Sequence, residues 1–377
     1  MGNRLDNLTI KGFKSICCLE EFPLDNINVL IGGNGSGKSN FIDLFRMLRA
    51  MMELSLPELA KANLTTYIKS GGGINDFLFN GPKITKQIEI KLIFGDNGYG
   101  FKLIPTANEE FVIDDEKRYY KHSHQPWWNM GGGYTTPGLL DEKDKPGARG
   151  YRSVASYIWE AIDSWRIYHF HDTSKSSPMR GYEIVQDNEY LRFDASNIAP
   201  FLLFLKEREK EAYDKIVTTV RLVTPFFDDF ILKPRMFGEK EKINLSWRQK
   251  GSDYPMQPYH FSDGTIRFIC LATALLQPNP PSTLIVDEPE LGLHPYAIDI
   301  LAELIKSSAQ KTQIIVSTQS PALVDNFEPQ NIIVVCRKGG TSTFKRLSKE
   351  ELNQWLEEYS IGDLWRKNII AGGPVHE

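Results

Sequence analysis

The sequence predicts an α/β fold in which both ends of the chain complete one doubly wound core around an inserted α+β lobe. Three apolar runs have the length and composition of buried strands: "INVLI" at 27–31, "TLIV" at 283–286 and "QIIVS" at 313–317. The first two are followed by helix-like segments at about 39–53 and 297–309. Strands that alternate with helices favour a parallel sheet covered on both faces.

The remaining segments predict further elements in chain order. An alternating pattern predicts a strand over 5–16, and "GDNG" between two apolar runs predicts a hairpin over 87–105. The polar residues 111–152 read as loops. Helices are expected over 154–165 and 199–227, and strands over 227–250.

Composition and charge set limits on the kind of protein this is. The 377 residues carry a net charge of −4, so no global charge favours nucleic acid or an anionic membrane surface. No apolar run approaches the roughly 18 residues of a membrane span, and the first residues lack the apolar region of a signal peptide. We therefore expect a cytoplasmic protein with no membrane partner.

The cysteines indicate neither a zinc site nor a disulfide framework. There are four, Cys17, Cys18, Cys270 and Cys336, and none forms a CxxC pair. Cys17 and Cys18 are adjacent in the chain. Reduced thiols of a cytosolic protein fit this pattern.

A glycine-rich loop follows the first buried strand and satisfies the pattern GxxxxGK[ST]. Its strand-loop-helix context is the one in which such a loop cradles the phosphates of a nucleotide with backbone N–H groups. Lys38 supplies positive charge to the same oxygens, and the Ser39 hydroxyl is a predicted ligand of Mg²⁺. The predicted binding residues are Gly32, Gly33, Asn34, Gly35, Ser36, Gly37, Lys38, Ser39 and Asn40. The loop predicts a P-loop NTPase that binds a magnesium nucleotide.

Two carboxylates end the second buried strand. The carboxyl ends of parallel strands face the ligand crevice, so Asp287 and Glu288 are expected beside the glycine loop. Asp287 is the predicted second protein ligand of Mg²⁺. Glu288 is the predicted general base or water-orienting group for attack on the γ-phosphate.

The segment "SDGTIRF" at 262–268 reads as a polar turn that opens an apolar helix, which suits anion binding. Together with the two motifs above it resembles the signature segment of the ABC ATPase superclass, specifically its RecF/SMC-like soluble branch. In ABC ATPases two heads dimerise, and each signature segment contacts the γ-phosphate held by the opposite loop. The resemblance implies that Ser262 and Gly264 bind nucleotide in trans. It also places Gln319 where most ABC heads carry a switch histidine, which implies slow turnover.

The resemblance extends to "GFKSI", "DEPELGLHP", "STQSP" and the tail "YSIGDLWRKNIIAGGP". These are similar to a family of bacterial ATPases described as AAA-type or RecF-like, with the Septu and OLD-type ATPases as broader relatives. Family members often stand beside nuclease or toxin-like genes in anti-phage systems. The resemblance implies ATP and Mg²⁺ as cofactors, a homodimer or higher homo-oligomer, and a separately encoded effector such as a nuclease.

The expected nucleotide-binding core is divided between the two ends of the chain. Residues 1–110 are predicted to hold the phosphate loop and an antiparallel sheet, residues 111–257 an inserted lobe, and residues 258–377 the signature, Asp-Glu strand, switch strand and tail. The sequence has no heptad repeat, which argues against SMC-style coiled-coil arms. The residues after "VSTQSP" are too few for an OLD-type nuclease domain. The absence of an "LSGGQ" segment argues against a transporter subunit. The sequence has no NKxD-like segment of the kind that recognises guanine, which favours ATP over GTP as the nucleotide.

Three functions remain open from the sequence. The first is an ATPase that controls an effector in anti-phage defence. The second is a RecF-like DNA-repair ATPase, and the third is an ATP-gated scaffold that rarely hydrolyses. Nucleic acid is a possible partner because six Lys and Arg and two aromatic residues occur in 233–250, although the pattern favours a solvated hairpin.

Two further features have a structural explanation and a functional one. His122 with His124, and His169 with His171, form HxH pairs without a third ligand in sequence, which favours hydrogen-bonded roles over metal binding. Lys14 in "GFKS" is expected to reach nucleotide on the resemblance alone.

Overall fold

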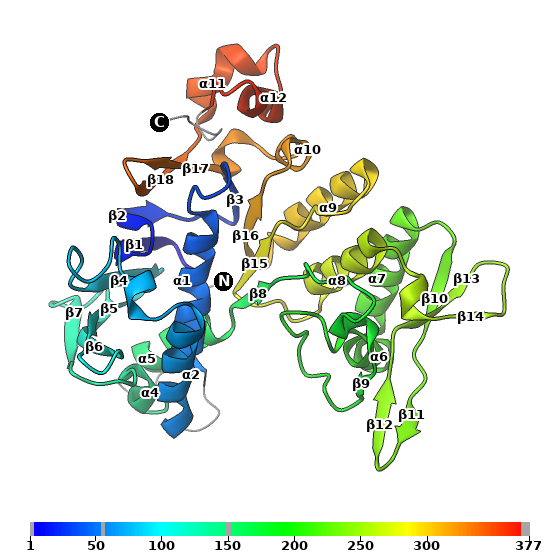
Figure 1. The fold of residues 1–377 in the computed structure, drawn as a ribbon, viewed down its shortest axis with the longest axis horizontal. Coiled ribbons are helices and arrows are strands. Elements are labelled where there is room, and N and C mark those ends of the chain that lie inside the picture. The colour runs from blue at the N-terminus through cyan, green and yellow to red at the C-terminus, as the bar shows by residue number, and fades with distance from the viewer. Residues whose placement is uncertain (1–3, 54–56, 148–151, 371–377) are drawn as a thin grey trace.

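The computed structural model describes residues 4–53, 57–147 and 152–370, with the backbone alone for 57–62 (Figure 1). A six-stranded sheet lies at its centre in the order β18-β17-β3-β16-β15-β8. Five of these strands are parallel, and β18 is an antiparallel edge strand. Their bounds are β3 (Ile27–Ile31), β8 (Arg166–Tyr168), β15 (Thr283–Asp287), β16 (Gln313–Thr318), β17 (Ile332–Lys338) and β18 (Thr341–Arg346).

Helices cover both faces of the central sheet, because the parallel strands are apolar on both sides. On one face, Val29 and Val316 belong to the same buried cluster as Ile266. On the other face, Leu30 and Ile315 are buried with Phe41 and other helix residues. The covering helices are α1 (Lys38–Met52), α5 (Val154–Asp163), α8 (Asp263–Leu276) and α9 (Pro295–Ser308). The predicted doubly wound α/β core is confirmed.

An antiparallel sheet packs beside α1 and α5 and uses the N-terminal third of the chain (Figure 1). Its order is β2-β1-β4-β5-β6-β7. The predicted hairpin is β4-β5, whose strands pair from Ile88↔Leu103 to Phe94↔Asn97. The strands are β1 (Asn7–Phe13), β2 (Ile16–Pro23), β4 (Ile88–Phe94), β5 (Asn97–Pro105), β6 (Phe111–Tyr120) and β7 (Trp127–Gly131). The helices α2 (Pro57–Ser70), α3 (Ile74–Phe77) and α4 (Leu139–Glu142) accompany it.

The expectation that residues 111–152 are loops is wrong, since β6, β7 and α4 lie there. Phe111 and Ile113 point into the core while charged neighbours face outward, and the polar composition hid this alternation. The buried carboxylate of Glu116 continues the inward row and accepts a hydrogen bond from Tyr99 Oη at 2.6 Å. The expected boundary at residue 110 falls between two paired strands, β5 and β6. The division into three domains stays a prediction.

A second lobe follows β8 and lies on the other side of the central sheet from the antiparallel sheet (Figure 1). The single helix expected over 199–227 is two helices, because the backbone of Glu209 leaves the helical region at φ −132° and ψ 55°. The lobe contains β9 (Glu183–Ile184), α6 (Ile198–Arg208), α7 (Lys210–Val223), β10 (Phe227–Ile231), β11 (Arg235–Phe237), β12 (Lys240–Ile243), β13 (Ser246–Gln249) and β14 (Pro255–Met256). Short 3₁₀ turns, η2 (Pro178–Arg180) and η3 (Pro258–His260), join these elements.

The C-terminal segment forms a small helical cap at the β17-β18 end of the central sheet (Figure 1). It comprises α10 (Pro321–Val324), η4 (Pro329–Asn331), α11 (Lys349–Leu356) and α12 (Ile361–Arg366). The last letters of the tail motif, "AGGP" at 371–374, lie outside the described residues. Among the helices that are described, none combines the length and apolarity needed to cross a membrane.

Candidate nucleotide-binding site

Three adjacent parallel strands end at the same edge of the central sheet, and a predicted site residue lies at or directly after the end of each. β16 lies between β3 and β15, and the register pairs Thr318 with Ile31 and Ser317 with Asp287. The glycine loop leaves β3 at this edge, Glu288 leaves β15, and Gln319 leaves β16. The fold thus brings together motifs that are separated by about 250 residues in the chain.

The glycine loop turns directly into α1, whose first turn is open to an anion. Gly37 stands at the N-cap without a side-chain cap, and no acidic residue lies in the first turn. The unpaired N–H groups and the helix dipole therefore favour a phosphate at this point. Lys38 is only 6% exposed, and its ammonium donates to the carbonyl oxygens of Gly32 at 2.6 Å and Gly33 at 3.1 Å. Lys38 is therefore held inside the loop that is predicted to bind the phosphates.

A chain of hydroxyl groups supports the loop from behind. Asn40 Nδ2 donates to Ser15 Oγ at 2.7 Å, and Ser342 Oγ donates to the Ser36 carbonyl at 2.6 Å. The two serine oxygens are 2.7 Å apart, so the Ser15 proton must point to Ser342. Gly37 has φ 114°, and any Cβ there would overlap Ser342 Oγ. Ser342 comes from edge strand β18, and no sequence pattern marked it as part of the site.

The charge of Lys38 is opposed by carboxylates at and after the end of β15. Burial lowers the pKa of Lys38, and the negative charges of Glu288, Asp287 and Glu290 oppose that shift. Ser36 Oγ is buried and has no hydrogen-bond partner in the described part of the chain. A buried hydroxyl without a partner costs free energy unless a ligand satisfies it, so a phosphate oxygen fits here.

The peptide unit between Asp287 and Glu288 is held from both sides. Glu288 N donates to the Ser317 carbonyl of β16 at 2.7 Å. On the other side, the Asp287 carbonyl lies 3.1 Å from Nε2 of His171. A carbonyl only accepts, so His171 carries its proton on Nε2 and donates. This peptide places Glu288 in the left-handed region at φ 44°, which non-glycine residues rarely occupy.

The predicted switch residue contacts the predicted base directly. Gln319 Nε2 donates a hydrogen bond to Glu288 Oε1. Below them the buried carboxylate of Glu290 accepts from Thr318 Oγ1 at 2.6 Å and from Gln319 N at 3.1 Å. Burial raises the pKa of Glu290. Glu290 was not predicted as a site residue, although it follows the Asp-Glu pair by two positions and couples the two loops.

The oxygen groups at this edge fit a magnesium ion that arrives with the phosphates. Ser39 is exposed at the start of α1, and Asp287 is half-buried at the end of β15. Mg²⁺ is commonly held by one or two protein oxygens, substrate phosphates and water. Within the described residues, no group of three or more His, Cys, Asp and Glu forms a cage for a resident metal. The donors present would hold the ion jointly with nucleotide.

The predicted signature segment opens α8, and its first residues face solvent. Ser262 is the N-cap and accepts from Thr265 N at 3.1 Å. Ser262 and Asp263 are exposed, while Gly264 packs so closely on the Gly292 carbonyl that any Cβ would overlap it. Arg267 of α8 is buried and donates to the carbonyls of Phe170, His171 and Leu291. The helix is therefore fastened to the loops after β8 and β15, but Ser262 stays open.

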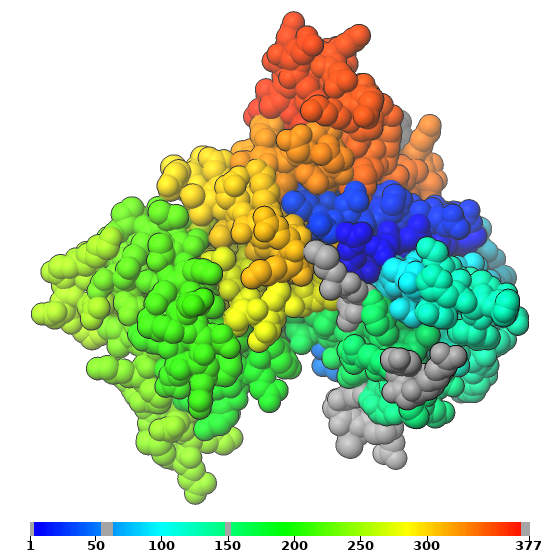
Figure 2. Space-filling view, turned by 180° about the vertical axis from the view of Figure 1, so that it is seen from behind, coloured from blue at the N-terminus to red at the C-terminus, as the bar shows by residue number. Residues whose placement is uncertain are grey.

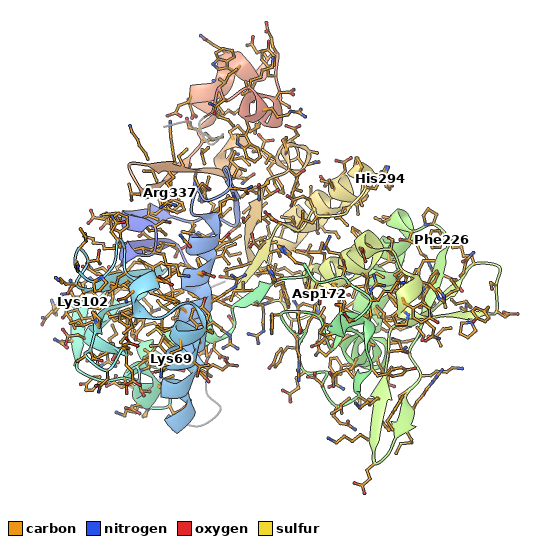
Figure 3. All side chains as sticks on the ribbon, in the orientation of Figure 1. Lys69, Lys102, Asp172, Phe226, His294 and Arg337 are labelled. Atoms are coloured by element: carbon orange, nitrogen blue, oxygen red, sulfur yellow. The ribbon has the colours of Figure 1, made fainter. Side chains whose placement is uncertain are left out.

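The histidine pairs and Lys14 have local partners. His169 and His171 follow β8, with ring centroids 3.9 Å apart, and this segment runs on to Asp172, labelled near the centre of Figure 3. His122 Nε2 lies 3.1 Å from Asp96 on the antiparallel sheet. Lys14 does not reach into the loop, because it pairs with Asp43 at 2.6 Å. One histidine of each HxH pair, His122 and His171, therefore has a side-chain hydrogen-bond contact, and the role of the pairs stays a prediction.

The matched family model covers the site from strand to switch. A family described as "AAA domain, putative AbiEii toxin, Type IV TA system" matches residues 27–325. This range begins with β3 and ends after Gln319, and it covers well over half of the chain. The chain belongs to this family. The predicted resemblance to AAA-type, SMC-like and OLD-like P-loop ATPases is confirmed with it.

Curated relatives match over parts of their length. The Old nuclease of Escherichia phage P2 is 31% identical over 198 residues, which is 47% of this chain and 34% of that protein. The chromosome partition protein Smc of Desulfitobacterium hafniense (strain Y51) is 29% identical over 147 residues, 34% of this chain and 11% of that protein. The chain thus spans about a third or less of these relatives.

Solved structures confirm the fold class. The Smc head domain with an extended coiled coil from Pyrococcus furiosus, solved with the C-terminal domain of ScpA, superposes with a TM-score of 0.51. The identity is 20%, and the match covers 95% of this chain and 99% of that one. This AAA-domain protein therefore has the ABC-type head fold that the sequence predicts.

Proposed function

We propose that this AAA-domain protein hydrolyses ATP to ADP and phosphate with the help of Mg²⁺. The observation that carries the proposal is the convergence of Lys38, Glu288 and Gln319 at one sheet edge beside an open helix N-terminus. Lys38 needs only to turn from the Gly32 and Gly33 carbonyls to meet the β- and γ-phosphates. The magnesium ion, when bound, would neutralise developing phosphate charge.

Glu288 and Gln319 have different roles in the proposed hydrolysis. Water attacks the γ-phosphorus, the bond to the β–γ bridging oxygen breaks, and Glu288 accepts the proton that water loses. Gln319 reaches the same carboxylate and can donate to a γ-phosphate oxygen. Because an amide carries no charge, it stabilises that oxygen less than a protonated histidine would. We expect slow turnover for this reason.

We further propose that two copies close around two ATP molecules. Ser262 is exposed at the N-terminus of α8, where free backbone N–H groups favour an anion. In the described residues its hydroxyl bonds only to Thr265, three positions further along the same turn. Ser262 and Gly264 would then contact the γ-phosphate held by the partner's loop. ATP binding and dimerisation would be linked.

The biological role that we propose is control of a separately encoded effector, a nuclease, in bacterial anti-phage defence in the cytoplasm. The family description and the match to part of the Old nuclease support an effector of this kind. A RecF-like repair ATPase and a slow ATP-gated scaffold are the alternatives. Co-purification with the products of neighbouring genes would distinguish effector control from DNA repair. Single-turnover hydrolysis would distinguish an active ATPase from the scaffold.

The variant Glu288→Gln tests the ATPase and the dimer together. It keeps the shape and a hydrogen bond to Gln319 but removes the base, so turnover should fall at least about 100-fold while ATP still binds. Size exclusion with light scattering should show more dimer in MgATP than wild type shows. Glu303→Gln, on the exposed surface of α9, is the matched control and should behave as wild type. Wild-type turnover by Glu288→Gln would show that Glu288 is not the base.

A further inference from the structure

A two-stranded ribbon projects from the second lobe, far from the sheet edge described above. It consists of β11 and β12, joined by the two-residue turn Gly238–Glu239. Figure 1 shows the ribbon at the bottom of the lobe, and it forms a separate projection in the space-filling view of Figure 2. Phe237 is 47% exposed and Met236 is 64% exposed, so the ribbon does not bury its apolar residues in the lobe.

The basic segment 233–250 does not act as one unit. Trp247 of β13 is 1% exposed and stacks on Phe261 inside the lobe, and Arg248 pairs with Asp228 at 2.5 Å. These two residues therefore belong to the fold. The cations that face solvent without such partners are concentrated on the ribbon.

The two faces of the ribbon differ sharply in charge. Side chains alternate along each strand, and the register pairs Arg235 with Lys242 and Phe237 with Lys240. These four residues therefore share one face, which we call the basic face. Glu241 lies on the opposite face, beside Met236.

An aromatic pair completes the basic face. The ring of Tyr182 lies 4.9 Å from that of Phe237, and its hydroxyl accepts from Arg235 Nη1 at 3.4 Å. Tyr182 immediately precedes β9, which pairs with β12 through Ile184↔Lys242. The basic face thus presents three cations and two aromatic rings.

This arrangement places like charges next to each other on the ribbon. Arg235 and Lys242 are directly opposite, and like charges at such positions repel. Among the described residues, none of the three cations has an ion pair. On the antiparallel sheet, by contrast, Lys102 and Lys117 both pair with Asp115, at 3.1 and 2.6 Å. Those two lysines of the antiparallel sheet are neutralised, and the three cations of the basic face are not.

We propose that the basic face binds single-stranded nucleic acid. Arg235, Lys240 and Lys242 would contact phosphates, and a base would stack on Phe237. Unpaired cations beside an exposed aromatic ring match a polymer that has both phosphates and flat bases. A duplex keeps its bases stacked on each other, so it would use the cations and not the ring. This binding does not depend on ATP hydrolysis or on dimerisation.

Fluorescence anisotropy with a labelled oligothymidylate of about 20 nucleotides tests the proposal. Lys240→Glu with Lys242→Glu should weaken binding at least about 10-fold at moderate salt and reduce the salt slope by about 2. Lys311→Glu with Lys349→Glu, two exposed lysines elsewhere, makes the same charge change and should bind as wild type. Phe237→Ala should weaken binding about 5-fold or more without changing the salt slope.

Several results would overturn the proposal. The oligonucleotide could fail to bind wild type, or the control pair could lose as much affinity as the ribbon pair. Polyglutamate of similar charge could compete equally, which would indicate a site for acidic proteins. Tighter binding of a duplex, unaffected by Phe237→Ala, would exclude the stacked base. ATPase activity measured on the same variants should stay unchanged, which separates this test from that of the nucleotide site.

Discussion

The strand-end edge and the N-terminus of α8 are both suited to an anion, but they differ in completeness. At the edge, Lys38 is buried in its loop, and Glu288 is bonded to both Ser317 and Gln319. At α8, Ser262 faces solvent and bonds only within its own first turn, as far as the described residues show. Hydrogen bonds thus fix the side chains at the strand-end edge, whereas Ser262 at the N-terminus of α8 is accessible to solvent.

This difference indicates which part of the site a single chain can supply. The edge has a lysine, a proposed base and a hydrogen-bond donor positioned by three adjacent strands, so we expect it to bind nucleotide without a second copy of the chain. The α8 terminus is rigid, because Arg267 and Gly264 fasten it, yet nothing in the described chain covers Ser262. A rigid open anion site is what a second molecule would need. The following predictions test this contrast, from the largest expected effect to the smallest.

Lys38→Ala should have the largest effect, because no other side chain of the loop offers a positive charge. We expect ATP turnover to fall at least about 100-fold, with nucleotide binding weakened in isothermal calorimetry. Lys69→Ala is the control, since this lysine is exposed at the end of α2 (Figure 3). Undiminished turnover in Lys38→Ala would remove the loop from the proposed site.

Ser262→Arg should separate the two regions. Nucleotide binding by the isolated chain should stay within about 2-fold of wild type, while ATP-driven dimerisation is lost because the cation fills the space for the partner's γ-phosphate. Ser307→Arg, on the exposed side of α9, should leave both unchanged.

Mixing Ser262→Arg chains with Lys38→Ala chains sharpens the same contrast. Each mixed dimer combines the two intact parts in one of its sites, so the mixture should regain ATPase activity that neither variant shows alone. If Ser262→Arg instead abolishes nucleotide binding with the fold intact by circular dichroism, the helix serves its own chain's nucleotide.

His171 should have the smallest effect, because it acts through the Asp287 carbonyl. His171→Leu removes the donor, and we expect kcat to fall about 10-fold with little change in nucleotide affinity. His171→Gln can place an amide N–H near the position of Nε2 and should recover most of the loss. Equal turnover in both variants would show that the hydrogen bond does not position the Asp287-Glu288 peptide.

The sequence predicted the elements whose pattern is local. Lys38 and Ser39 lie in a loop that is recognisable from its glycines and its flanking strand and helix. The hairpin at 87–105 has a turn signal between apolar runs. Residues 111–131 were missed, because charged side chains on β6 masked a short inward row that only the pairing of β6 with β5 and β7 makes clear.

By itself the sequence determined the phosphate loop, the Asp-Glu strand end and the doubly wound class, because each depends on residues near one another in the chain. Only the tertiary structure decided that Ser342 supports the loop, that His171 holds the Asp287 carbonyl and that Glu290 joins the switch to the base. The tertiary structure also decided that, within the basic segment 233–250, Trp247 is buried and Phe237 is exposed. These roles arise from contacts between distant strands, and hydrogen bonds across a sheet leave no periodic trace in sequence.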